Sequence, residues 1–368
     1  MRARVVLEDG FHLEGEAFAG EGEVCAEIVC HTDQTGYQEV LTDPANYGRA
    51  VVFTIPVVGN YGVNPDDSES ERITPQAVLV REYTDRPSNY RATQSLGDWL
   101  GAASVLGVHR IDTRALVLHL REHGPKKAVI TTKGGDVEEL ARRAAAAPSR
   151  TENELLAAIG PEEPYTYCDG GNRRVAVLDL GVRRSFLAQL AEVGCRVTVL
   201  PARASADEIL AHGPDVVVVA GGPEEPLAWR SVRRTVEALL GRLPVFGIGL
   251  GHLLVGQACG LDVFPLTTGH RGGGHPVREL ETGEVLMTSQ NHGYALAVPE
   301  GAGELTAQGL SGPAPLRVTH RSLFDGTVEG LAVPAWQVYT VQFQPAASRG
   351  PGLATYVPRL FERIGDDA

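Results

Sequence analysis

The chain has 368 residues, which exceeds the roughly 100 to 200 residues of a usual single domain, so we expect two domains. Hydrophobic residues make up 43% of the chain, but no apolar run reaches the roughly 20 residues of a membrane span. The first residues are too charged for a signal peptide, and the net charge of −13 argues against a nucleic-acid surface. We therefore expect a soluble, cytoplasmic protein with neither a membrane nor a nucleic-acid partner.

Residues 1–150 alternate short β-type runs with Gly, Asn and Pro. Such runs occur at residues 4–7 and 51–55. Together with the helices described next, this pattern predicts an α+β domain over residues 1–150.

Two helices are predicted in this first domain. Residues 112–121 have Asp112 or Thr113 as a candidate N-cap, and Gly124 is placed to end the helix. A second helix is predicted over residues 136–147, where Pro148 would stop it.

The residue composition and the pattern of apolar runs change after residue 150. Residues 151–173 are charged and rich in turn formers, which predicts an interdomain linker. Residues 174–368 then contain short, nearly continuous apolar runs separated by helix-like segments, which predicts an α/β domain with a doubly wound, mainly parallel sheet. The apolar runs are residues 175–178, 196–200, 216–219 and 245–248. Binding sites in such sheets lie where the strands end, so residues 221–223 and 247–252 are the places to search for chemistry.

The cysteines give no sign of a zinc or redox site, because no C-x-x-C pair occurs. We expect all five to be inert, small apolar residues, and we expect no metal and no cofactor. The five are Cys25, Cys30, Cys168, Cys195 and Cys259.

Several long motifs resemble a known family. The first half contains TGYQEVLTDP at residues 35–44, GNYGVN at 59–64 and IDTRAL at 111–116, and the second half contains TSQNHG at 288–293 and RVTHRSLFDGT at 317–327. These motifs resemble the small subunit of carbamoyl phosphate synthetase, whose second domain is a class I glutamine amidotransferase. The resemblance implies that a small subunit hydrolyses glutamine and passes ammonia to a large synthetase subunit, without a cofactor of its own.

The resemblance also locates the catalytic positions, and three of them have changed. Glutaminase chemistry needs a thiolate, a histidine that moves protons and a carboxylate that orients the histidine. The family elbow G-I-C-L-G-H-Q is GIGLGHL here, which places Gly249 at the nucleophile. The family motif Q-x-H-P-E-A is QFQPAA here, which places Gln344 at the base and Ala346 at the acid. Glutamine cannot exchange a proton near neutral pH, so we expect no glutaminase activity.

Positions that would bind the substrate have changed too. Leu253 replaces the elbow glutamine, and Ala45 replaces the serine of the family motif D-P-S, so two polar partners of the substrate are lost. Glu224 brings a carboxylate into the oxyanion loop, where it should repel a developing negative charge. Gly222, Asn291 and Gly293 remain at family positions that contact glutamine, and we favour a structural role for them because loops at sheet ends need glycines for their turns.

Two hypotheses follow, and both stay open at this point. In the first, the chain is a pseudo-glutaminase that binds or regulates a large synthetase subunit using free ammonia. In the second, the altered cleft binds a different small molecule and performs acid-base or cyclisation chemistry in a specialised biosynthetic pathway. The candidate groups for such a repurposed site are Glu224, His252, His270, Arg271, His275 and His292. Ordinary glutamine-dependent synthesis is the third, least favoured hypothesis.

Overall fold

The computed structural model describes residues 1–298, 301, 305–310, 312–345 and 356–366. The chain divides into two compact units, Met1–Ser149 and Arg150–Ala368, which we describe separately. Among the described residues, no helix combines the length and the apolar character that crossing a membrane requires.

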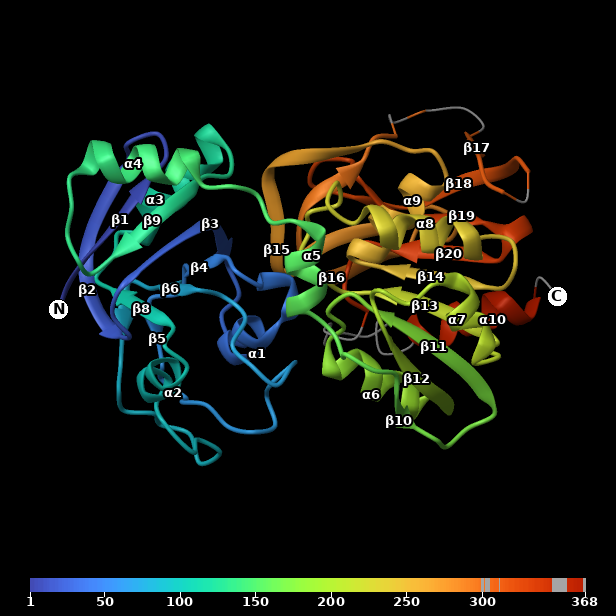
Figure 1. Cartoon of the computed structure of the whole chain (residues 1–368), viewed down its shortest axis with the longest axis horizontal. Coiled ribbons are helices and arrows are strands. Elements are labelled where there is room, and N and C mark those ends of the chain that lie inside the picture. Colours follow the sequence, from blue (N-terminus) through green and yellow to red (C-terminus); the bar gives the residue numbers. More distant parts are fainter. Residues whose placement is uncertain (299–300, 302–304, 311, 346–355, 367–368) are drawn as a thin grey trace. The chain divides into compact units, whose positions relative to one another are not determined.

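Unit 1 is built on a closed barrel with the strand order β1-β2-β8-β6-β4-β3-β9 (Figure 1). Its interior is filled by alternate apolar side chains of the barrel strands, such as Val5, Ile28 and Val52. The barrel strands are β1 (Arg2–Leu7), β2 (His12–Ala19), β3 (Glu23–His31), β4 (Ala50–Phe53), β6 (Ala77–Leu79), β8 (Leu106–His109) and β9 (Lys127–Thr131), and β5 (Val57–Val58) pairs with β7 (Glu82–Tyr83).

The predicted helices of unit 1 are confirmed together with their caps. The carboxylate of Asp112 accepts the Ala115 N–H at 3.0 Å, and the carboxylate of Asp136 accepts the Glu139 N–H at 3.1 Å. Gly124 ends the first of these helices with φ +79°. The helices of unit 1 are α1 (Tyr37–Thr42), the 3₁₀ helix η1 (Pro44–Asn46), α2 (Leu96–Ala102), α3 (Thr113–His123) and α4 (Val137–Ala146).

The stretch 151–173, which we expected to be a linker, contains ordered elements of unit 2. Helix α5 (Glu152–Ala158) starts with a capping box between Thr151 and Glu154. Strand β10 (Tyr165–Cys168) pairs antiparallel with β12 at the edge of the large sheet. The many turn formers of this stretch therefore punctuate short elements, and an edge strand needs no continuous apolar run because it is only partly covered.

Unit 2 contains an 11-stranded sheet with the order β10-β12-β11-β13-β14-β20-β19-β18-β15-β16 and with β17 paired to β18. Strands β12, β11, β13, β14 and β20 are parallel, as predicted for the doubly wound core. The antiparallel strands that extend the sheet beyond β20 were not predicted. The strands are β11 (Arg173–Asp179), β12 (Cys195–Pro201), β13 (Val216–Ala220), β14 (Val245–Ile248), β15 (Val263–Glu279), β16 (Val285–Leu296), β17 (Leu305–Ala307), β18 (Ala314–Ser322), β19 (Val328–Val333) and β20 (Val338–Val341).

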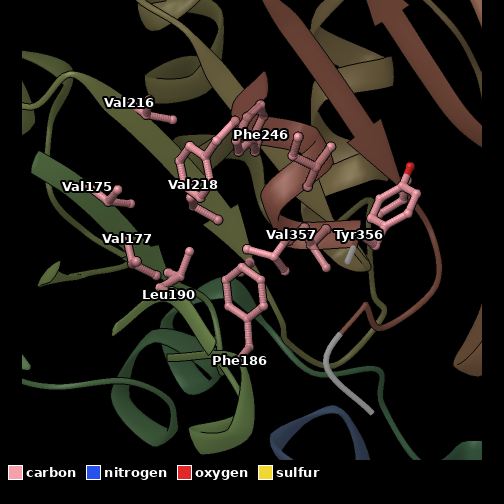
Figure 2. Packing of buried hydrophobic residues seen from close by; sticks show 14 of the residues in the cluster. Val175, Val177, Phe186, Leu190, Val216, Val218, Phe246, Tyr356 and Val357 are labelled. Carbon is pink, nitrogen blue, oxygen red and sulfur yellow. The ribbon is translucent and has the colours of Figure 1, made fainter. Parts of the chain in front are cut away.

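Helices cover both faces of the parallel core. Phe186 and Leu190 of α6 and Tyr356 and Val357 of α10 point into the same apolar cluster as alternate side chains of the strands, such as Val218 (Figure 2). Helix α9 packs on the opposite face, against Val219. The remaining elements of unit 2 are α6 (Arg184–Glu192), α7 (Ala206–Ala211), α8 (Arg230–Leu239), α9 (Leu250–Ala258), the 3₁₀ helix η2 (Pro334–Trp336) and α10 (Tyr356–Asp366).

Candidate functional site

The site lies at the turn from β14 into α9, where Gly249 forms a sharp elbow with φ +61° and ψ −119°. This is a conformation that residues with a side chain rarely adopt, and a strained turn of this kind holds the nucleophile of several hydrolase folds. Gly251 allows the helix to approach the sheet, because a Cβ at this position would collide with the Val219 carbonyl. The elbow therefore keeps the backbone of a nucleophile position although its residue is glycine.

The side chain of Gln344 lies next to the elbow at Gly249. Gln344 follows β20, and its N–H donates to the Ser289 carbonyl at 2.9 Å in an isolated bridge. A Cβ added to Gly249 would lie 3.2 Å from Nε2 of Gln344. Residues 249 and 344 thus face each other, and neither glycine nor a glutamine amide has a side chain that serves as a nucleophile or a base. Ala346, the predicted acid position, lies outside the described residues.

Glu224 lies in the loop that follows β13, but it is not exposed to solvent. Its side chain is buried, and Oε2 accepts the backbone N–H of Gly293 at 2.5 Å and that of Tyr294 at 3.3 Å. Oε1 accepts Nε2 of Gln342 at 2.7 Å. The carboxylate is therefore directed at β16 and at the strand end that carries Gln344.

The oxyanion loop depends on two glycines with positive φ, Gly221 at +85° and Gly222 at +96°. A Cβ on Gly221 would collide with the Gly181 carbonyl, and one on Gly222 would collide with the Leu180 carbonyl. Both glycines are therefore required by packing, whatever chemistry the loop performs.

Two predicted positions on α9 are buried. Leu253 is inaccessible to solvent, so its side chain is part of the packing beneath the elbow. His252 is also fully buried, with Nδ1 2.7 Å from Oγ1 of Thr340, and burial lowers the pKa of His252 to about 3. Because its ring is neutral and directed at Thr340, His252 is poorly placed for acid-base work on a substrate.

Three of the predicted histidines come together on the hairpin formed by β15 and β16. The ring centroids of His270 and His292 are 4.7 Å apart, and those of His270 and His275 are 5.3 Å apart. Burial, followed by the charge of His270, lowers the pKa of His275 to about 4. Burial opposes a charge on His292, but the hydrogen bond and charge of Glu329 raise the pKa of His292.

Glu329 and Gln290 belong to the same buried cluster and were missed by sequence reasoning. Oε1 of Glu329 lies 3.3 Å from Nδ1 of His270 and 3.6 Å from Nε2 of His292. Burial alone would raise the pKa of Glu329, but its bonds to the two histidines lower it to about 2. A carboxylate inside an otherwise apolar strand, VEGLAV, was the available sequence signal. Three residues of this cluster, His270, His292 and Glu329, lie close enough together to hold a metal ion.

The remaining predicted residues occupy two places. Asn291 pairs in register with Arg271, whose guanidinium lies beside Gly293: a Cβ on Gly293 would be 3.0 Å from a terminal nitrogen of Arg271. Ala45 belongs to unit 1, where it is buried in η1 and its N–H donates to the carboxylate of Asp43 at 3.0 Å. The hairpin thus brings Arg271, Asn291 and Gly293 together.

Comparison with known proteins agrees with this architecture. Residues 5–130 match the family model "Carbamoyl-phosphate synthase small chain, CPSase domain", and residues 176–364 match "Glutamine amidotransferase class-I". Curated proteins named carbamoyl phosphate synthase small chain are similar over almost their whole length. The relative from Syntrophotalea carbinolica is 39% identical over 100% of this chain and 97% of its own. The relative from Akkermansia muciniphila is 40% identical over 99% of this chain and 97% of its own. The relative from Listeria innocua is 41% identical over 96% of this chain and 94% of its own. The chain therefore belongs to the carbamoyl phosphate synthase small chain family.

Proposed function

We propose that this chain is a small-chain homologue that does not hydrolyse glutamine and that binds a large synthetase subunit, which then uses free ammonia. The observation that carries the proposal is the pair Gly249 and Gln344, which keeps the placement of a nucleophile and a base without their chemistry. Glycine cannot form an acyl-enzyme, and the amide of glutamine cannot remove a proton from a nucleophile near neutral pH.

The two buried cysteines of unit 2 do not offer a replacement nucleophile. Cys259 follows the last turn of α9, about 15 Å along the helix axis from Gly249, and burial raises the pKa of its thiol to about 12. Cys195 begins β12, and burial raises its pKa to about 11. A thiol is nucleophilic as the thiolate, so both are poor nucleophiles at neutral pH.

Glu224 supports the loss of glutaminase activity in a second way. Its carboxylate already accepts the N–H of Gly293, a position that the family resemblance assigns to glutamine binding. A substrate that approached this amide would have to displace a short, charge-assisted hydrogen bond inside the protein. The change at position 224 therefore acts on binding, while the changes at 249 and 344 act on catalysis.

Binding to a large subunit is proposed because the first domain is retained as a complete fold. Residues 5–130 match the small-chain domain model, and they form a closed barrel with a filled core. The resemblance implies that this domain makes much of the contact with the large subunit. A chain that had lost its only task would not be expected to retain this domain in full.

The second hypothesis, a repurposed acid-base cleft, receives less support. It requires groups that a small molecule can reach, whereas Glu224, His252 and His292 are buried and hydrogen-bonded within the protein. A carboxylate and histidines held in this way act as structural groups unless the site opens.

The test is co-expression with the large synthetase subunit of the same organism. We expect the two chains to elute as one complex from size-exclusion chromatography, and the complex to make carbamoyl phosphate from ammonia but not from glutamine. A complex formed with the small chain of Listeria innocua and its own large subunit is the control that both assays work. Glutamine-dependent synthesis would refute the loss of glutaminase activity, and separate elution of the two chains at micromolar concentration would refute the binding role.

A further inference from the structure

The buried cluster on β15, β16 and β19 has two histidine nitrogens directed at the same two oxygens. Nδ1 of His270 is 3.0 Å from Oε1 of Gln290 and 3.3 Å from Oε1 of Glu329. Nε2 of His292 is 2.7 Å from Oε1 of Gln290 and 3.6 Å from Oε1 of Glu329. All four side chains are buried, with exposed fractions of 5% or less.

The other nitrogen of each ring is occupied as a donor. Nε2 of His270 lies 2.9 Å from a carboxylate oxygen of Asp325, and Nδ1 of His292 lies 2.9 Å from the carbonyl oxygen of Tyr294. A carbonyl and an ionised carboxylate can only accept, so these nitrogens carry the ring protons. In neutral rings, Nδ1 of His270 and Nε2 of His292 therefore present lone pairs.

The oxygens that face these lone pairs are acceptors as well. The amide of Gln290 is oriented by its nitrogen, which donates to Oγ1 of Thr288 at 3.0 Å and to Oε2 of Glu329 at 3.1 Å. Rotating the amide by 180° would place its oxygen against the Glu329 carboxylate. With neutral rings, two imidazole nitrogens and two oxygens thus converge without a donor between them, and added protons or a metal ion would supply the missing positive charge.

Two protons or one metal ion could supply this positive charge. Two protons would create two imidazolium rings with centroids 4.7 Å apart, balanced by the carboxylates of Glu329 and Asp325, whereas one metal ion would satisfy both nitrogens and both oxygens at once. We propose that Nδ1 of His270, Nε2 of His292, Oε1 of Glu329 and Oε1 of Gln290 bind one divalent transition-metal cation of the zinc type. Neutral imidazoles and a carboxylate are the ligands that zinc prefers next to thiolates.

The spacing of the four atoms fits such an ion. Zinc bonds of 2.0–2.2 Å in a tetrahedron place neighbouring ligand atoms about 3.4 Å apart. The four nitrogen–oxygen separations, four of the six edges of such a tetrahedron, lie between 2.7 and 3.6 Å, and the shortest, between His292 and Gln290, would lengthen when the ion binds. The ligand atoms of His270, His292 and Glu329 all lie within 4.8 Å of one another. Asp325 and the Tyr294 carbonyl hold the rings as outer partners do in zinc proteins.

The burial of all four ligands indicates a structural metal site, without an open position for a substrate. The ion would connect the hairpin of β15 and β16 to β19, in the antiparallel part of the sheet. Gln290 and His292 flank Asn291, so the metal would also fix the segment of β16 that contacts Glu224. The proposal does not depend on the loss of glutaminase activity, because its readout is metal content.

The experiment measures zinc in the full chain by inductively coupled plasma mass spectrometry after removal of any affinity tag. We expect about one equivalent of zinc per chain. After treatment with a chelator, Co²⁺ should bind with the intense visible absorption of a four-coordinate site, and Zn²⁺ should displace it. Folding of every variant is checked by circular dichroism.

Two variants and two controls test the ligand set. Asp325→Asn changes a partly exposed outer partner and should weaken Zn²⁺ binding about 10- to 100-fold. Glu329→Gln removes the charged ligand and should weaken it further. His275→Asn, next to the site, and His212→Asn, on the surface, should leave the affinity unchanged. The proposal is overturned if the folded protein neither contains nor binds a stoichiometric metal ion, or if Asp325→Asn and Glu329→Gln bind Zn²⁺ as the unaltered chain does.

Discussion

A Cβ built on Gly249 would lie 3.2 Å from Nε2 of Gln344, so the elbow still directs residue 249 toward residue 344. The backbone conformation of Gly249, with φ +61°, is one that a side chain makes unfavourable. In a working nucleophile elbow the fold tolerates this strain for the sake of the reaction. Glycine at this position removes the strain, and under the proposed function it removes the reaction as well.

The first prediction concerns this strain. Gly249→Ala should lower the free energy of unfolding by about 1–3 kcal/mol, because alanine must adopt the same backbone conformation. Urea denaturation checks the value. The double variant Gly249→Ala/Gln344→Ala separates the two contributions, since it removes the contact with Nε2 but leaves the backbone strain. If Gly249→Ala is as stable as the unaltered chain, the described elbow conformation is wrong.

The second prediction concerns Glu224. Glu224→Ala leaves the amides of Gly293 and Tyr294 and the side-chain amide of Gln342 without this acceptor, which should reduce stability by about 1–3 kcal/mol. Glu224→Gln should lose less, because its carbonyl oxygen can still accept from the backbone of β16. Urea denaturation of both variants checks this order, and Glu192→Ala on an exposed position serves as the control. Equal stability of all three variants would contradict the buried role of Glu224.

The elements that sequence reasoning predicted are those whose signal is local. The apolar runs of the parallel core, such as 216–219, need no knowledge of the fold because each is buried on both faces. The caps at Asp112 and Asp136 are also local, since each bonds to a backbone N–H three residues later. The elbow at Gly249 was located by its place at the end of a predicted strand and by the family motif.

What could not be predicted depends on pairings between distant segments. Strand β15 (Val263–Glu279) contains a run of glycines and no clear alternation, and its register shifts twice along β16. The burial of Glu224 depends on amides about 70 positions later in the chain. The convergence of His270 and His292 on Glu329 likewise joins three strands, so no local spacing in the sequence indicated this cluster.

The third prediction concerns thiol reactivity. Burial raises the pKa of the thiols of Cys25, Cys195 and Cys259, but only Cys25 is exposed to solvent, whereas Cys195 and Cys259 are buried. Iodoacetamide at pH 7.5 should therefore label Cys25 before Cys195 and Cys259, which it should reach only when the protein unfolds. Peptide mapping by mass spectrometry gives the order, and the same reaction in urea is the control. Rapid labelling of Cys259 in the folded protein would reveal a reactive thiol near the elbow helix and weaken the proposed loss of function.

The fourth prediction concerns pH and His252. Burial lowers the pKa of His252 from 6.5 to about 3, an effect partly opposed by the charge of Glu329 and increased by those of His292 and His320. Since the folded chain keeps this ring neutral, the unfolded chain binds the additional proton below pH 6.5. Stability is therefore lost as the pH falls from about 6.5 toward 3, and the contribution is constant below that range.

His252→Asn removes this proton-binding group, while its amide can still bond to Thr340. Between pH 7 and pH 4.5 the unaltered chain should lose about 2–3 kcal/mol more stability than the variant, because each unit of pKa difference corresponds to about 1.4 kcal/mol. Urea denaturation at both pH values in the presence of a chelator measures the difference, with His212→Asn as the surface control. The chelator keeps any metal at His292 from contributing to it. Parallel stability curves for the unaltered chain and His252→Asn would show that His252 is not held neutral in the folded protein.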